Sequence, residues 1–385
     1  MTKRKVCVVV TARASYSRIK SVLCAIQQHK ALELQLVVGA SAVLDRYGNV
    51  ISCMERDGFH IVAKVYMVLE GENLTTMAKT TGIGVLELAT VFDNIKPDVV
   101  ITVADRYETI ATAIAASFMN IPVAHVQGGE VTGSIDEKVR HAVTKLSDIH
   151  FVATQKAADR VKLMGEEPSR VFVTGCPSID LAAEVAKQAM LNFDPFEKYG
   201  GVGETMDISG GYVVVMQHPV TTEYEQAFTQ VAEVLKAVVA LDLPALWFWP
   251  NVDAGSDGVS KCIRIFREQN SSCKIHFFRH MMSEDFLRLL CNCRCLIGNS
   301  SVGIRETSFL GVPVVNVGNR QSGRERGQNV IDVGYNRSEI VDAVRKQLGH
   351  GPWPCNPLYG DGNAGTRIAS LLSDVTLTIE KKFVN

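Results

Sequence analysis

Short apolar segments alternate with amphipathic segments along most of this 385-residue chain. Residues 6–10 read VCVVV, a pattern typical of a buried strand, and residues 17–29 carry apolar side chains at helical spacing. Further helices are predicted at 73–92, despite two internal glycines, and in the Ala-rich stretch 108–118. Apolar runs predict the other strands of this half at 32–40, 98–104, 121–126, 150–154 and 171–175.

The same alternation resumes after a looser stretch at 187–211. A helix is predicted where Phe228, Val231, Leu235 and Val238 form an apolar stripe. Alternating strands and helices favour parallel sheets with right-handed crossovers. The strands predicted in this half cover 212–217, 245–250, 274–278, 293–298 and 312–318.

Two segments, 98–129 and 293–320, share one layout: a strand, a polar turn, a short helix, a Pro-Val strand and a glycine-containing loop. The sequence therefore predicts an α/β fold of two Rossmann-like, doubly wound domains that face a ligand cleft. We expect an N-terminal domain at 1–185 and a C-terminal domain at 186–356. Residues 357–385 should form a loop and a helix that pack back toward the N-terminal domain.

Composition excludes several classes of partner. The formal net charge is −1, so no global field favours nucleic acid or an anionic membrane. No apolar run approaches the roughly 20 residues of a membrane span. The start, Lys3 to Ala14, imitates a signal peptide, but its apolar part is short, Val-rich and followed by Arg13, which favours a first strand.

Ten cysteines in a chain without an export signal predict reduced thiols and a cytoplasmic location. Cys291, Cys293 and Cys295 alternate, and a metal site is one interpretation of that spacing. A strand face of small buried residues is the favoured alternative, because the pattern lacks an obvious fourth ligand.

The clearest anion-binding pattern is residues 298–306, GNSSVGIRE, which follow a predicted strand and should open a helix. Ser300 or Ser301 can cap that helix, whose free N–H groups favour phosphate, and Gly303 permits close approach. A plain capped helix is the alternative. Arg320 and Arg324 favour a diphosphate, because guanidinium groups bind phosphate in a bidentate manner.

Polar residues also follow other strands of the second half. His218 ends a strand just before Pro219, and it could donate to a phosphate or act as an acid, although a structural role is the alternative. Asn251 and Asp253 could form hydrogen bonds with a base or a ribose, and a structural role in a turn accounts for these residues equally well. The 298–306 loop carries neither a G-x-G-x-x-G nor a Walker sequence, so a nicotinamide or ATP site there lacks its fingerprint.

In the first half, Ser15 or Ser17 could cap the first helix or contact phosphate beside Arg13. Asp105 lies next to Arg106, where a neighbouring cation would keep a carboxylate ionised as a base. A salt-bridged turn is the alternative for that pair.

Further acids follow the strand at 121–126. Asp136 and Glu137 begin a helical pattern, where first-turn acids also complement a helix dipole. Glu130 lies in a loop after two glycines, and His141 is one helical turn from Glu137 and can pair with it. The second half thus suits a nucleoside diphosphate and the first half proton chemistry, which predicts an activated sugar as ligand.

These segments together resemble a known family, the hydrolysing UDP-N-acetylglucosamine 2-epimerases, including the epimerase half of the bifunctional animal enzyme of sialic acid synthesis. The resemblance covers nearly the whole chain. It implies a glycosyltransferase-B-type fold with UDP on the C-terminal domain, the sugar in the cleft, no metal and no dissociable cofactor. It also implies a homodimer or homotetramer. The motifs that carry it include VGASAVLDRYGNV, ADRYET, HVQGGEVTGSIDEKVRHAVTKL, TGCPSID, QHPVTTE, PNVDAGS, IGNSSVGIRE, GNRQSGRERGQNV and YGDGNA.

The resemblance also implies a reaction. A base removes the C2 proton of UDP-N-acetylglucosamine as UDP leaves C1, and water then adds to the glycal to give N-acetylmannosamine. Asp105 and Asp136 match family acid–base residues, Glu130 and Glu137 lie close to them in sequence, and His218 would assist the departing phosphate. The residues that match UDP or diphosphate contacts are Arg13, Ser17, Arg106, His218, Asn251, His280, Ser300, Ser301, Glu306 and Arg320.

One catalytic position departs from the family pattern. Gln127 stands where the family has a Glu, and an amide cannot exchange a proton near neutral pH. Either Asp105, Asp136 and Glu130 cover both acid–base roles, or the reaction differs, or the exchange, natural or introduced, impairs turnover. A second departure is Ser15, which replaces an Asp of the family. A UDP-sugar glycosyltransferase and a non-catalytic nucleotide-sugar binder are the competing functions.

Overall fold

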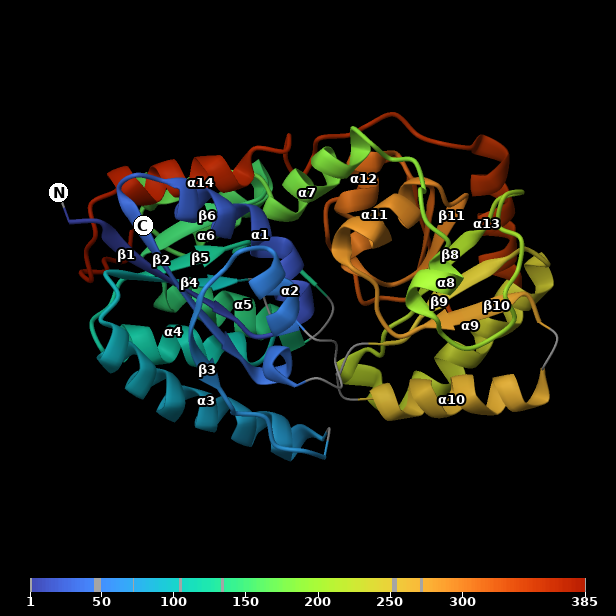
Figure 1. Ribbon diagram of the computed structural model, residues 1–385, viewed down its shortest axis with the longest axis horizontal. Helices are drawn as coiled ribbons and strands as arrows, with labels where there is room; N and C mark the ends of the chain where they lie inside the picture. Colours follow the sequence, from blue (N-terminus) through green and yellow to red (C-terminus); the bar gives the residue numbers. More distant parts are fainter. Residues whose placement is uncertain are drawn as a thin grey trace. The chain divides into compact units, whose positions relative to one another are not determined.

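A computed structural model describes residues 2–44, 50–71, 73–103, 106–132, 135–250, 255–270 and 273–384. The chain forms two compact units (Figure 1). Unit 1 comprises Met1–Glu130, Ile135–Leu181 and Tyr359–Asn385. Unit 2 comprises Val131–Ser134 and Ala182–Leu358.

Unit 1 is built on a seven-stranded sheet with the order β3-β2-β1-β4-β5-β6-β7, in which the strands pair in parallel. Its strands are β1 (Arg4–Val10), β2 (Leu32–Gly39), β3 (Ile61–Val65), β4 (Val99–Val103), β5 (Val123–Val126), β6 (Ile149–Val152) and β7 (Val171–Val173). Its helices are α1 (Arg13–Gln28), α2 (Val50–Arg56), α3 (Leu74–Ile95), α4 (Thr109–Phe118), α5 (Ile135–Leu146), α6 (Gln155–Leu163), α7 (Pro177–Ala186, which crosses into unit 2) and α14 (Ala364–Asp374).

Helices cover both faces of this sheet, as Figure 1 shows. Alternate residues of β1 explain why: Val8 packs in one apolar cluster with α1 and α14, whereas Val9 packs in another with α3 and α4. Side chains of a strand alternate between faces, so a strand covered on both sides reads as a continuous apolar run. The run VCVVV is such a strand.

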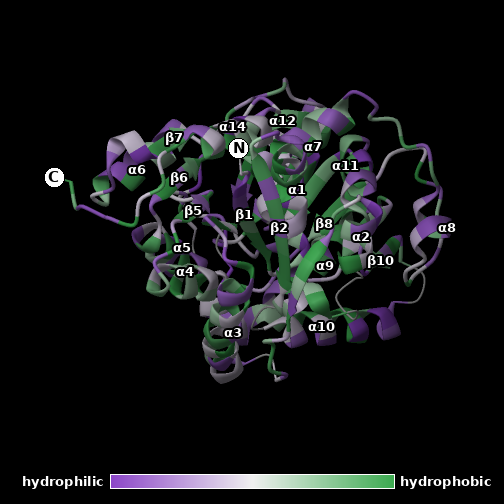
Figure 2. Cartoon of the chain, turned by 60° about the vertical axis from the view of Figure 1, so that its left-hand side comes forward, coloured by the Kyte–Doolittle hydropathy of each residue, from purple (hydrophilic) through white to green (hydrophobic). Residues whose placement is uncertain are grey.

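Unit 2 repeats the plan with a six-stranded sheet in the order β10-β9-β8-β11-β12-β13, again paired in parallel. Its strands are β8 (Val213–Met216), β9 (Ala245–Phe248), β10 (Ile275–Phe278), β11 (Cys295–Gly298), β12 (Val314–Val317) and β13 (Val330–Val333). Its other helices are α8 (Pro195–Tyr199), α9 (Ala227–Leu241), α10 (Ser256–Gln269), α11 (Ser283–Cys291), α12 (Glu306–Leu310) and α13 (Arg337–His350). Figure 2 shows hydrophobic colouring along β2 and hydrophilic colouring on α8.

In both sheets the strand order reverses beside the first strand, between β1 and β4 and between β8 and β11. This arrangement is the Rossmann-like, doubly wound topology, and it confirms the predicted fold class. Ligands of such sheets bind at the carboxyl ends of the strands near the reversal. Among the described helices, none combines the length and apolarity of a membrane span.

Two local predictions are wrong. Helix α1 begins at Arg13 rather than Ser17, and its N-cap is Ala12, so neither Ser15 nor Ser17 caps it. The Ser17 hydroxyl instead donates to the carbonyl of Arg13 one turn earlier, a bond that a serine inside a helix can make.

The cysteine triplet does not share a strand face. Cys291 ends α11, Cys293 lies in the connection, and Cys295 begins β11. Burial raises the pKa of the Cys291 thiol to about 11 and that of Cys295 to about 12. Protonated thiols are poor metal ligands, because the thiolate is the ligand form.

The end of the chain is bound to unit 1. Helix α14 packs on α1, and the Arg4 guanidinium donates to the carbonyls of Leu372 and Val375, the latter at 2.9 Å. Further on, Lys381 reaches a polar cluster around the buried carboxylate of Glu166.

Glu166 accepts hydrogen bonds from three side chains. Its oxygens lie 2.7 Å from Lys145 Nζ, 3.0 Å from His150 Nε2 and 2.6 Å from Lys381 Nζ. Burial alone would raise the pKa of Glu166, but the hydrogen bonds from His150, Lys145 and Lys381 lower it to about 2. The carboxylate is therefore charged at neutral pH, and its donors compensate the burial.

This cluster predicts an acid-dependent loss of stability. The folded pKa of about 2 lies below the model value of 4.5, so the unfolded chain binds the proton first. The contribution of the charged Glu166 to the free energy of unfolding is full above pH 4.5, and it is lost as the pH falls from 4.5 toward 2. After allowance for solvent screening, we expect it to amount to about 2 kcal/mol in urea unfolding.

The matched comparison is Glu166→Gln against Glu87→Gln, which changes an exposed Glu on α3. The difference in unfolding free energy between the parent chain and Glu166→Gln should shrink between pH 7 and pH 3. An equal difference at both pH values would contradict the assignment.

Candidate active site

The predicted ligand residues lie at the carboxyl ends of the central strands in each unit. In unit 2, His218 follows β8, Ser300 and Ser301 follow β11, and Arg320 follows β12. These strands are neighbours in the order β8-β11-β12. The topology of the sheet thus brings together residues that are far apart in the sequence.

Asn299 connects these three loops. It is fully buried, and its side chain accepts from the His218 amide at 2.8 Å and donates to the His218 carbonyl at 2.8 Å. Its own carbonyl accepts from Arg320 Nη1 at 3.2 Å and from Gln321 Nε2 at 2.8 Å. Asn299 therefore fixes the His218 backbone and the Arg320 side chain relative to the Ser300 loop.

Ser300 and Ser301 begin a single 3-10 turn, Ser301–Gly303, rather than a long helix. The Ser300 hydroxyl caps this turn by accepting from the Val302 amide at 3.4 Å, and α12 after it has five residues. The prediction of a helix opening at this loop is therefore only partly right. The groups of this loop that could bind an anion are the amides and hydroxyls of the turn, because a short helix adds little dipole.

Two glycines of this loop have different roles. Gly298 has φ +129°, and a Cβ there would lie 2.2 Å from the Met216 carbonyl oxygen, so only glycine fits. At Gly303 a Cβ would instead meet Leu296 and Val314 of the sheet at 3.1 and 3.2 Å. The predicted close approach of Gly303 to a ligand is thus an approach to the core.

Arg305 places a buried cation behind the loop. Its Nη2 donates to Ser301 Oγ at 2.8 Å, and the residue is 1% exposed. Because guanidinium only donates, this bond occupies an acceptor site of the Ser301 hydroxyl. The hydroxyl hydrogen is then directed to another acceptor, which suits a phosphate oxygen.

The remaining predicted residues of unit 2 differ in exposure. Glu306 is buried at the start of α12, Arg324 is buried, and His280 is exposed beyond β10. Asn251, predicted as a ligand contact, and Asp253 beside it lie outside the described residues.

In unit 1, Arg13 and Ser17 lie in the first turns of α1, just after β1, and Arg106 follows β4. Arg106 Nε lies 2.7 Å from Glu108 Oε1, a carboxylate that is 1% exposed. The turn after β4 therefore contains a salt bridge between Arg106 and Glu108. Asp105 lies outside the described residues.

Gln127 follows β5 in an unusual conformation. Its φ of +69° lies in the left-handed region, and its backbone N–H donates to the Phe151 carbonyl of β6 at 2.9 Å. Gln127 Nε2 lies 2.6 Å from Cys176 Sγ, which in turn lies 3.0 Å from Ser178 Oγ. The Gln127 side chain is thus buried, and its amide contacts the Cys176 thiol.

Helix α5 carries Asp136 and Glu137 in its first turn. The Glu137 carboxylate lies 3.4 Å from His141 Nε2, so this predicted pair forms. The buried Arg140 guanidinium donates to the Glu130 carbonyl at 2.9 Å, which joins the helix to the loop after β5. Glu130, Asp136 and Glu137 therefore lie in one connected segment at the carboxyl end of the sheet.

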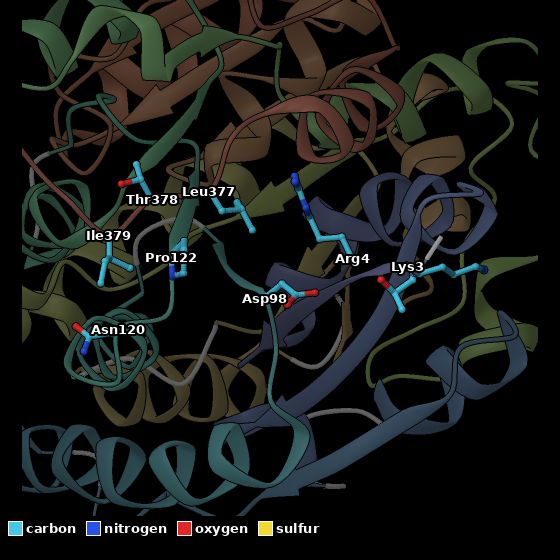
Figure 3. A pocket seen from close by; sticks show the side chains of 9 residues that line it. Lys3, Arg4, Asp98, Asn120, Pro122, Leu377, Thr378 and Ile379 are labelled. Atoms are coloured by element: carbon cyan, nitrogen blue, oxygen red, sulfur yellow. The ribbon is translucent and has the colours of Figure 1, made fainter.

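The opposite edge of this sheet has an open hollow of about 560 Å³. It lies beside the starts of β1, β4 and β5, and Figure 3 shows Arg4, Asp98 and Leu377 around it. The predicted acid–base and anion residues do not line it, so this hollow is separate from the candidate site.

The family model of UDP-N-acetylglucosamine 2-epimerase matches residues 24–373. The chain belongs to this family. It is therefore an enzyme of the 2-epimerase class.

The relatives extend over almost the whole chain. A UDP-N,N'-diacetylbacillosamine 2-epimerase (hydrolyzing) of Legionella pneumophila is 33% identical over 375 residues, which cover 97% of this chain and 97% of the relative. The polysialic acid biosynthesis protein P7 of Escherichia coli is 33% identical over 349 residues, 89% of this chain and 85% of its own. The fold is also that of the Methanocaldococcus jannaschii UDP-GlcNAc 2-epimerase structure in complex with UDP-GlcNAc and UDP, with a TM-score of 0.78, 18% identity and coverage of 96% and 99%.

Sequence reasoning missed three residues that organise this epimerase site. Asn299 and Arg305 both lie in the motif IGNSSVGIRE, but their roles depend on partners in other loops or on burial. Cys176 lies in TGCPSID, 49 positions from Gln127. The signal that could have identified Asn299 and Arg305 is their spacing, because Asn299 directly precedes the two serines and Arg305 lies four positions after Ser301.

Proposed function

We propose that the protein is a hydrolysing epimerase of UDP-linked 2-acetamido sugars, and that UDP-N-acetylglucosamine is converted to N-acetylmannosamine and UDP. The observation that carries the proposal is the Asn299 network, which joins His218, Arg320 and the Ser300 loop at the strand reversal of unit 2. The residues that this network joins carry three kinds of phosphate donor: an imidazole, a guanidinium and paired hydroxyls.

Unit 2 supplies the nucleotide contacts in this proposal. Ser300, Ser301 and Arg320 would stabilise the diphosphate as its charge grows during C1–O cleavage, which is the main electrostatic demand of the reaction. His218 would donate to the departing phosphate, and Glu306 would accept from ribose hydroxyls. The other proposed UDP contacts are Arg13, Ser17, Arg106, Asn251 and His280.

Unit 1 supplies the proton chemistry. One carboxylate, Asp105 or Asp136, takes the C2 proton while the C1–O electron pair leaves with UDP, which gives a 2-acetamidoglucal. Water then adds its oxygen to C1, and a proton returns to C2 on the opposite face. Glu130 and Glu137 are the proposed auxiliary acids, and Gln127 acts as a hydrogen-bonding residue.

The substrate can carry one acetamido group or two, since the Legionella relative is named for a diacetylated sugar. The test incubates the protein separately with UDP-N-acetylglucosamine and UDP-N,N'-diacetylbacillosamine in deuterated water, and follows products by NMR. Release of UDP with a free 2-epimeric sugar that carries deuterium at C2 supports the proposal. A UDP-linked epimer, acceptor-dependent UDP release, or binding without turnover would contradict it.

Arg320→Ala should weaken UDP binding measured by calorimetry about tenfold or more, because a charge-assisted hydrogen bond contributes roughly 1.5–3 kcal/mol. Arg345→Ala, which removes an exposed arginine of α13, is the control and should bind UDP like the parent. Equal affinity of the two variants would remove Arg320 from the diphosphate site.

A further inference from the structure

The last described residues of the chain run along the amino-terminal edge of the sheet of unit 1. We call residues 375–384 the C-terminal strap. Leu377 and Ile379 line the hollow at the amino-terminal edge of the sheet, as Figure 3 shows. At the start of the strap, the Arg4 guanidinium donates to the Val375 carbonyl at 2.9 Å, and Arg170 Nη1 donates to the Thr376 carbonyl at 2.5 Å.

The strap then reaches the end of α5. Lys381 Nζ donates to the carbonyls of Thr144, at 3.3 Å, and Ser147, and it lies 2.6 Å from Glu166 Oε2. Carbonyls at a helix C-terminus lack intrahelical partners and carry partial negative charge. The ammonium therefore satisfies the last turn of α5 and ties it to the carboxylate of Glu166.

A third contact fixes the end of the strap. The Val384 amide donates to the Gly165 carbonyl at 3.1 Å, and the Phe383 ring lies over Gly165. A Cβ at Gly165 would lie 2.3 Å from that ring, and Lys145 Nζ is 5.3 Å from the ring centroid. The ring thus occupies space that the glycine leaves open.

The two ends of α5 lie at opposite edges of the sheet, because the helix connects β5 to the parallel strand β6. Its first turn carries Asp136 and Glu137, and its last turn contacts the strap. Twelve helical residues form a rod about 18 Å long. A rigid rod transmits a displacement of one end to the other.

We propose that Lys381 is a positioning residue, which holds the C-terminal end of α5 through Thr144, Ser147 and Glu166 and thereby fixes Asp136 at the other end. The proposal rests on the proposed function, in which Asp136 exchanges a proton with the sugar. A displacement of about 1 Å at a reacting group can cost up to 10²-fold in rate. The strap therefore connects the end of the chain with proton transfer at the far edge of the sheet.

The test compares Lys381→Met with Lys382→Met, which removes the same charge from the adjacent exposed residue. Lys381→Met should lower kcat roughly fivefold or more, with KM changed less than about twofold, because unit 2 still binds UDP. Hydrogen exchange at the amides of α5 should become faster. Lys381→Arg should recover most of the turnover, because a guanidinium can donate to the same carbonyls.

If Lys381→Met does not fold, Phe383→Ala loosens the strap without removing a charge, and it should show the same split between kcat and KM. Unchanged kcat together with unchanged exchange in α5 overturns the proposal, as does an equal effect of Lys382→Met. If the parent chain lacks turnover, the proposed function fails, and the exchange of α5 alone decides the role of Lys381.

Discussion

Asp136→Asn is expected to lower kcat by roughly 10²–10⁴-fold, the usual contribution of a general acid or base. The exchange keeps the size of the side chain but removes a group that exchanges protons. Asp136 lies in the first turn of α5, a helix that Arg140 joins to the Glu130 carbonyl and that Lys381 contacts at its C-terminal end. A steady-state assay of UDP release measures the effect.

UDP affinity separates a chemical defect from a binding defect. Asp136 belongs to unit 1, whereas the proposed diphosphate contacts Ser301 and Arg320 belong to unit 2, so calorimetry should give an unchanged Kd for UDP. Lys138→Gln is the control, because it changes an exposed residue of the same helix that has no proposed role in the reaction. An equal loss in both variants would indicate damage to α5 rather than removal of a catalytic proton.

Gln127→Glu is expected to raise kcat about tenfold or more, because it places a group that exchanges protons beside the sugar. The environment of Gln127 accepts either side chain. Cys176 Sγ accepts from the present amide, and a thiol can also donate to a carboxylate, with the Ser178 hydroxyl adjusting beside it. Burial also favours the protonated carboxyl, which suits a group that must act as an acid near neutral pH.

The pH dependence of kcat gives a second measurement for this exchange. A carboxyl that takes part in proton transfer adds an ionisation to the profile. Gln127→Ala removes the contact with Cys176 and should lower turnover, which controls for a general change of the pocket. A folded Gln127→Glu variant with reduced turnover would show that the acid–base set works without a carboxyl at this position.

The α/β fold could be predicted because the residue pattern of each strand reflects how that strand is buried. Runs such as 6–10 and 213–216 are apolar at every position, as expected for parallel strands covered on both faces. Helix boundaries were less certain. The first turn of α1 carries no apolar stripe between Arg13 and Ser15, so periodicity placed its start four residues late.

The motifs identified the polar residues of the site but not their partners. Arg106 forms a salt bridge with Glu108, a partner that the sequence pattern did not predict. Ser300 and Ser301 were expected to open a helix, and they form a 3-10 turn backed by the Arg305 guanidinium. Which donor meets which acceptor depends on side-chain directions that spacing does not specify.

The sequence by itself determined the two doubly wound domains, the family, and the polar residues that follow the central strands, because these depend on local pattern and residue type. Tertiary structure alone decided that Asn299 joins three loops, that Cys176 faces Gln127, and that Lys381 meets the end of α5. The last of these contacts spans 234 positions of sequence. Such contacts form only when sheet order and helix packing bring distant segments together, and no local pattern encodes that proximity.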